Sequence, residues 1–121
     1  MLNLRGEPVG ELIFKDKELC YITTRNAKNG HIFSRKTKFN GRTINNGVAI
    51  DVAILKKLFA HNVKSLIFHI QHFESQSFYG MIDLYQFMEK SESICYDRDD
   101  LKHKYGKQRV VGMDELERVK I

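Results

Sequence analysis

The chain has 121 residues, which fits one domain with a single core. Its composition, 42% hydrophobic and 29% charged, is that of a globular protein and excludes disorder as the default state. The two cysteines are too few for a disulfide scaffold or a four-ligand zinc site, and no apolar run approaches the ~18 residues of a membrane-spanning helix.

The stretch from residue 11 to residue 47 predicts a basic β-hairpin region. Its first part, GELIFKDKELCYITTR, indicates two strands joined by a turn at Asp16-Lys17. Asn29-Gly30 tolerates positive φ and is a strong hairpin signal. We therefore expect HIFSRKTKF, residues 31–39, to form a third strand that extends the hairpin.

Hydrophobic residues at helical spacing predict a central helix over residues 50–61, with Asp51 as its N-cap. The following stretches, VKSLIFHIQHF and SQSFYGMI, predict two strands that pair across a turn. A short helix is expected over residues 83–91, with Asp83 at its start.

In the last third of the chain, ESICYD and RVVGM indicate short strands separated by a charged loop, residues 97–108. Asp114 and Glu117 have the spacing of a capping box, which predicts a second short helix over residues 113–120. Together these elements predict a single α+β domain, residues 1–121, with a mainly antiparallel sheet, one central helix and two short helices.

Charge is unevenly distributed along the chain, whose net charge is +5. Residues 1–66 hold twelve Lys and Arg against five Asp and Glu, whereas residues 67–121 hold eight against ten. No acid stands between Glu18 and Asp51, and that interval holds six cations: Arg25, Lys28, Arg35, Lys36, Lys38 and Arg42. Such a one-sided field steers anionic partners, although a basic face that only aids solubility would have the same pattern.

Aromatic side chains are interleaved with these cations, and that combination suits phosphates and stacked bases. We expect the six cations to contact phosphates and Tyr21 to stack on a base. Phe33 and Phe39 are further candidates for stacking, although their pattern fits core packing better. An acidic protein surface would attract the same charges.

Other patterns that could carry chemistry are weaker. His69 and His72 fall on opposite faces of a strand, so they cannot chelate a metal together. Two acidic groups could serve a metal-dependent nuclease: Asp83 with Glu89 and Lys90, or Asp97, Asp99 and Asp100 with Lys102. The first group diverges on a helix, and the second fits a solvated loop better. We predict no catalytic residue, metal site or cofactor.

The sequence thus predicts a small basic module that binds DNA or RNA. The small size, the absence of a catalytic motif and the bias towards Lys, Asn, Ile and Phe together suggest an accessory protein from an AT-rich genome, such as that of a phage or mobile element. The alternatives are a protein-interaction module or inhibitor that docks its basic hairpin on an acidic partner and, third, a metal-dependent nuclease. The N-terminal stretch lacks the apolar core of a signal peptide, so we expect a cytoplasmic protein without a membrane partner.

Overall fold

The computed structural model describes residues 10–33, 36–98 and 103–121. In these ranges strands dominate, and two short 3₁₀ turns, η1 (Ala27–Asn29) and η3 (Met113–Glu115), accompany two α-helices, α1 (Val52–Ala60) and α2 (Leu84–Lys90). The strands are β1 (Glu11–Lys15), β2 (Glu18–Asn26), β3 (Thr37–Phe39), β4 (Arg42–Ile44), β5 (Gly47–Asp51), β6 (Ser65–Phe73), β7 (Gln76–Asp83), β8 (Glu92–Arg98), β9 (His103–Gly112) and β10 (Glu117–Val119).

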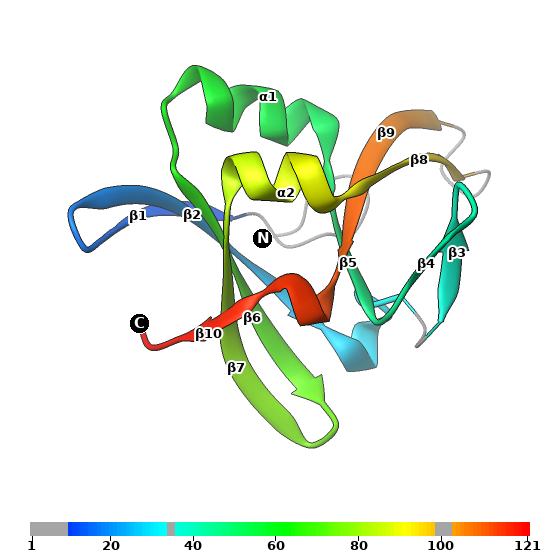
Figure 1. Cartoon of the computed structure of the whole chain (residues 1–121), viewed down its shortest axis with the longest axis horizontal. Coiled ribbons are helices and arrows are strands. Elements are labelled where there is room, and N and C mark those ends of the chain that lie inside the picture. The colour runs from blue at the N-terminus through cyan, green and yellow to red at the C-terminus, as the bar shows by residue number, and fades with distance from the viewer. Residues whose placement is uncertain (1–9, 34–35, 99–102) are drawn as a thin grey trace.

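The strands form three sheets (Figure 1). The largest has the order β1-β2-β6-β7-β10, a second has the order β5-β9-β8, and β3 pairs with β4 alone. Among the described strands, every pairing is antiparallel except that of β2 with β6. The predicted single α+β domain with a mainly antiparallel arrangement is therefore confirmed.

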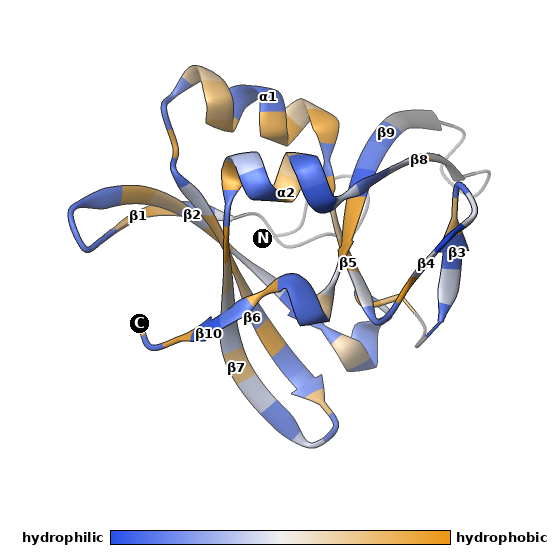
Figure 2. Ribbon diagram, in the orientation of Figure 1, coloured by the Kyte–Doolittle hydropathy of each residue, from blue (hydrophilic) through white to orange (hydrophobic). Residues whose placement is uncertain are grey.

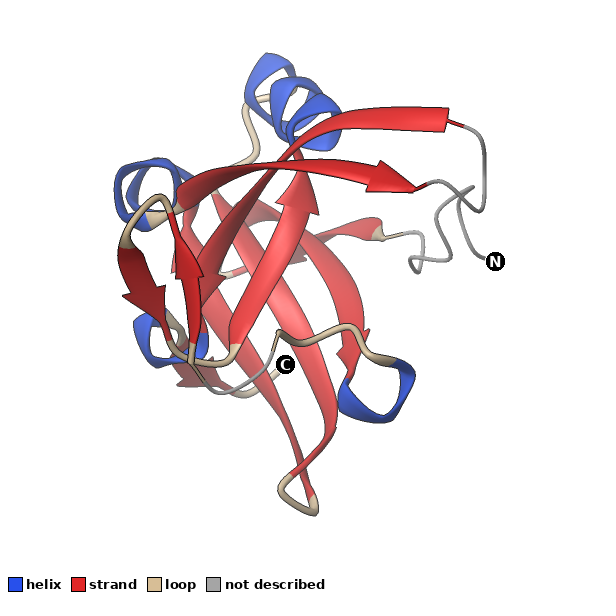
Figure 3. Cartoon of the chain, turned by 90° about the vertical axis from the view of Figure 1, so that its right-hand side faces the viewer, coloured by secondary structure: helices blue, strands red, loops and turns tan. Residues whose placement is uncertain are grey.

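The main core lies between the two larger sheets and the helices. Strand β6 supplies Leu66, Phe68 and Ile70, which are fully buried, and Val48 and Val111 join them from β5 and β9. All five residues of β5 are buried. Orange stretches of ribbon mark the apolar residues of the strands in the hydropathy view of Figure 2. Figure 3 shows the strands curving around this interior, with the helices outside them.

The two α-helices lie near each other at one end of the molecule, where Phe59 and Tyr85 meet edge to face with their ring centroids 5.4 Å apart. The predicted helices over residues 50–61 and 83–91 are confirmed as α1 and α2. Asp83 caps α2 as expected, because its Oδ1 accepts hydrogen bonds from the backbone N–H groups of Tyr85 and Gln86. Asp51 stands at the N-cap of α1, but its carboxylate accepts a hydrogen bond from Gln108 rather than capping the helix. In the described part of the chain, neither helix has the length and apolarity to cross a membrane.

The predicted third strand of the N-terminal hairpin is wrong. The β1–β2 hairpin forms as expected, but β6 occupies the other side of β2 in parallel register, with Thr23 opposite Phe68. After β2 the chain turns away through η1, where Asn26 accepts a hydrogen bond from the Lys28 N–H and donates one to His31. Among the described residues of the expected strand, only 37–39 form a strand, and they pair with β4.

The predicted helix over residues 113–120 is also wrong. The chain forms η3 and then β10, which pairs antiparallel with β7. An eight-residue helix is marginal on its own, whereas the edge of β7 offers backbone partners to an extended chain. Leu116 packs closely over Gly80 of β7, where any side chain at position 80 would collide with it.

The β1–β2 turn makes a prediction about stability. Asp16 and Lys17 have φ of 53° and 67°, a left-handed conformation that costs a residue with a side chain about 1 kcal/mol. Because glycine lacks this cost but adds chain entropy to the unfolded state, Lys17→Gly should raise the free energy of unfolding by about 0.5 kcal/mol. Urea denaturation measures this change.

The matched control is Lys56→Gly, which places the same substitution at an exposed lysine inside α1. Here the free energy of unfolding should fall by about 1 kcal/mol, since glycine weakens a helix interior. If both variants lost stability, the left-handed turn would be contradicted.

Candidate nucleic-acid interface

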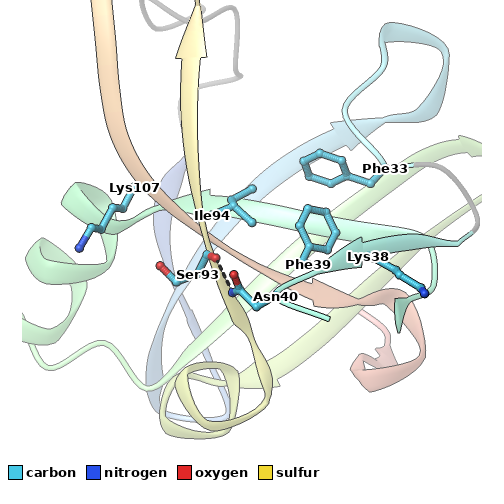
Figure 4. Close-up of a pocket in the computed structure, with 7 residues that line it drawn as sticks. All are labelled: Phe33, Lys38, Phe39, Asn40, Ser93, Ile94 and Lys107. Carbon is cyan, nitrogen blue, oxygen red and sulfur yellow. Dashed lines mark hydrogen bonds between the residues drawn. The ribbon is translucent and has the colours of Figure 1, made fainter. Parts of the chain in front are cut away.

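An open groove of about 630 Å³ lies between the β3–β4 hairpin and strands β8 and β9 (Figure 4). It is lined by seven residues: Phe33, Lys38, Phe39, Asn40, Ser93, Ile94 and Lys107. We call it the lysine–phenylalanine groove. Two stretches of the acid-free interval, around residues 33 and 39, thus meet two strands of the C-terminal third.

A small second core forms the floor of this groove. Phe33 and Phe39 pack against Ile44, Ala49 and Val110, and their rings meet edge to face at 5.2 Å and 81°. The Phe33 N–H donates a hydrogen bond of 2.9 Å to the carbonyl oxygen of Gly47 and so fixes the chain there. Both rings are half-buried, so each combines a packed side with a side that faces the groove.

The β3–β4 hairpin is fastened to β8 by hydrogen bonds from its turn. The Asn40 side chain donates to the Ser93 carbonyl oxygen at 2.9 Å and to the Glu92 carboxylate at 3.3 Å. Arg42 donates to the carbonyl oxygen of Lys90 at 2.9 Å and to Glu92 at 3.2 Å. The hydrogen bond from Asn40 and then that from Arg42 hold the pKa of Glu92 below its ordinary value.

The charge at the groove is positive. Figure 4 shows Lys107 on one side of the aromatic pair and Lys38 on the other, and both lysines are exposed. Among the described residues that line the groove there is no carboxylate. Glu92 lies beside it, but its two oxygens face Asn40 and Arg42. An anionic ligand would therefore meet two cations and an apolar floor.

Arg25, one of the six predicted phosphate contacts, is buried with 4% of its surface exposed. Its guanidinium donates to the Ala49 carbonyl oxygen from both Nε and Nη2, and to Thr23 and the Thr24 carbonyl oxygen from Nη1. It also lies over the ring of Phe68 at 5.6 Å. Arg25 therefore joins β2 to β5 inside the protein and has no place in a surface site.

Of the other five predicted phosphate contacts, Lys38 is the one that lines the groove in the described part of the chain. Lys36, just before β3, and Lys28, on η1, are exposed but do not line the groove. Arg42 anchors the β3–β4 hairpin, and Arg35 lies outside the described residues. Tyr21 packs against the main core and its hydroxyl accepts a hydrogen bond from the Gly10 N–H, so it is not an open stacking surface.

The structure also places the weaker candidates. His69 stacks on Tyr79 at 4.4 Å, and in the described residues no three His, Cys, Asp or Glu side chains gather closely enough to hold a metal ion. Asp83 is used as the cap of α2. Asp99, Asp100 and Lys102 lie outside the described residues, and so does the side chain of Asp97.

A second hollow, of about 750 Å³, lies along β7 and β10 and has Arg118 and Lys120 in its lining. Its aromatic side chains already have partners there, because Arg118 lies over the ring of Phe78 at 4.0 Å and His69 covers Tyr79. The lysine–phenylalanine groove is the better candidate for an anionic aromatic ligand.

Sequence reasoning missed Lys107, Ser93 and Ile94. Lys107 falls in the stretch 97–108, which was expected to be a loop, whereas β9 begins at His103 and places Lys107 opposite Cys95 of β8. The alternation in KQRVV, with buried Gln108 and Val110, was the one local signal of a strand there.

Comparisons of the chain with protein-family models, with curated proteins and with solved structures find no match.

The buried position of Arg25 makes a prediction. Arg25→Ala should lower the free energy of unfolding by about 2–4 kcal/mol, because it leaves buried oxygens such as that of Ala49 without their donors. The control Arg118→Ala removes an exposed arginine and should cost less than about 1 kcal/mol. Chemical denaturation compares the two, and equal losses would contradict the internal role of Arg25.

A second prediction concerns Glu92. Asn40→Gly keeps the turn, since Asn40 has φ of 54°, but removes the hydrogen bond that lowers the Glu92 pKa most. The pKa of Glu92 should therefore rise towards the ordinary glutamate value, which carboxyl ¹³C NMR titration measures. The control Thr43→Ala, at an exposed position of β4, should leave the pKa of Glu92 unchanged.

The same pKa has a consequence for stability. Because folding lowers the pKa of Glu92, the contacts of its carboxylate stabilise the protein fully at pH values above the pKa that Glu92 has in the unfolded chain. This stabilisation is lost as the pH falls through the lower folded value. A Glu92 pKa that is the same in the native chain and in Asn40→Gly would contradict the anchoring role of Asn40.

Proposed function

We propose that the protein binds single-stranded nucleic acid in the lysine–phenylalanine groove. The observation that carries the proposal is the position of two exposed lysines on either side of a half-buried phenylalanine pair, with no carboxylate among the described lining residues. Lysines that follow a sugar–phosphate backbone and aromatic rings on which bases stack are the two elements of sequence-tolerant recognition of single strands.

The geometry favours an unpaired strand over a duplex. A two-stranded β-ribbon that enters the major groove of DNA must project from the protein. Here β3 and β4 are only three residues long each, and their hairpin is held against β8. The exposed sides of Phe33 and Phe39 lie within the groove, so a base must leave its stack to reach them. Unpaired bases do so at little cost.

Direct binding tests the proposal. Fluorescence anisotropy with labelled single-stranded DNA and RNA, and with a duplex of the same length, should show tighter binding of a single strand. Affinity should fall steeply with salt, because bound phosphates release counterions. The absence of binding at low salt would refute the proposal, and so would displacement of the strand by polyglutamate as readily as by unlabelled oligonucleotide.

Substitutions assign the binding to this groove. Lys38→Ala and Lys107→Ala should each weaken binding and reduce the slope of log K against log salt by about 0.7, the loss of one phosphate contact to a single strand. Phe39→Leu keeps an apolar side chain on the floor but removes the ring, and should weaken binding about tenfold or more at an unchanged salt slope.

The matched control is Lys56→Ala, which removes the same charge from the exposed face of α1, outside the groove. It should leave both affinity and salt slope nearly unchanged. If it weakened binding as much as Lys38→Ala, the interaction would be a general effect of net charge, and the groove would have no special role.

A further inference from the structure

Strand β1 is an edge of the largest sheet, and among the described residues no strand pairs with its outer side. Two large apolar side chains on one face of β1 are exposed: Leu12 keeps 50% of its surface and Phe14 keeps 76%. They continue the exposed apolar surface of Tyr85, which is itself 71% exposed and shares a hollow with Phe14 and Phe59. An apolar edge of this kind is a template for another strand.

The register of the β1–β2 hairpin shows which backbone groups this edge offers. Lys15 and Glu18 flank the two-residue turn, so they form the hydrogen-bonded pair next to it. Pairs alternate along an antiparallel ladder, so the backbone groups of Ile13 also face β2. The N–H and C=O groups of Leu12 and Phe14 therefore point outward.

We propose that β1 pairs antiparallel with β1 of a second copy of this chain, about a two-fold axis at Ile13. This register places Leu12 of each copy opposite Phe14 of the other. These are the two residues whose backbone groups point outward, so each opposed pair exchanges both of its hydrogen bonds. The two five-stranded sheets become one continuous sheet, and the interface is the same patch on both copies.

The charges of β1 fit this partner. The strand reads ELIFK, with an acid at one end and a base at the other, so the two-fold axis sets Glu11 of each copy opposite Lys15 of the other. These residues are non-hydrogen-bonded pairs, whose side chains approach most closely. Lys15 also lies 3.0 Å from Asp16, but Asp16 is a residue of the exposed turn and leaves Lys15 able to face a second carboxylate.

The apolar side chains fit it as well. Leu12 and Phe14 of both copies would form one cluster on the face that carries Phe59 and Tyr85. A short strand is one way in which proteins protect an edge from pairing, but here both side chains on that face are large and apolar. The contact is smaller than a standard interface, so we expect a dimer that dissociates in the micromolar range.

Charge reversal tests the register. Glu11→Lys sets a lysine opposite Lys15 of the other copy, and Lys15→Glu sets a glutamate opposite Glu11, so each variant has two like-charged pairs. Sedimentation velocity should show a dimer for the native chain, and a dimerisation Kd about 10- to 100-fold weaker for either variant. An equimolar mixture of the two variants should dimerise again, because a mixed dimer restores both opposite-charge pairs.

The double variant E11K/K15E keeps the composition and regains complementary pairs, so it should dimerise as the native chain does. If the double variant dimerises while the single variants do not, the single variants lose dimerisation through like charges at the interface and not through a damaged fold. A native chain that remains monomeric would overturn the proposal, whether the edge is then free or is taken by another extended segment. A dimer that neither single reversal weakens would overturn it too. In Figure 1 the β1–β2 hairpin and the β3–β4 hairpin lie on opposite sides of the molecule. The dimerisation test therefore does not depend on whether the groove binds nucleic acid.

Discussion

The parallel pairing of β2 with β6 is the constraint on which the rest of this structure depends. It places β6 at the centre of the largest sheet, where Leu66, Phe68 and Ile70 form the middle of the core. It also takes the side of β2 that a continued N-terminal hairpin would need. A parallel pair requires a long crossover, and here β3, β4, β5 and α1 lie between the two strands in the chain. The basic interval is therefore part of a crossover.

Because the basic interval is part of this crossover, its cationic side chains point in different directions from different strands. Arg25 falls on the side of β2 that faces β5 and becomes an internal donor to Ala49. Arg42 reaches across to β8 and meets Glu92, an acid of the C-terminal half. Lys38 remains exposed, and β9 adds Lys107 to the same groove. A run without acids along the chain is thus a poor guide to positive surface in this fold, and the groove owes half of its described charge to a strand outside that run.

Local patterns predicted the local structure well. The helices around Leu55 and Phe87, the β6–β7 hairpin and the cap at Asp83 all follow from spacing and turn chemistry within about ten residues. The failures are choices between competing long-range partners. Asn29-Gly30 fits a hairpin turn, yet the chain forms η1 there because β2 already has two neighbours. The capping box at Asp114 predicts a helix, but the chain there forms β10 because the edge of β7 offers it a long-range partner. The groove forms because β8 and β9 pair with each other and lie beside β3, and no local sequence pattern predicts this arrangement.

The pairing of β2 with β6 can be observed directly by NMR. In the native chain, we expect nuclear Overhauser contacts between the backbone protons of these two strands in parallel register, such as those linking Thr23 and Thr24 to Phe68 and His69. The amides of β2 should also be among the slowest to exchange, since this strand has a neighbour on each side. Cross-strand contacts between residues 18–25 and 31–39 in antiparallel register, in place of those to β6, would contradict the parallel pairing of β2 with β6.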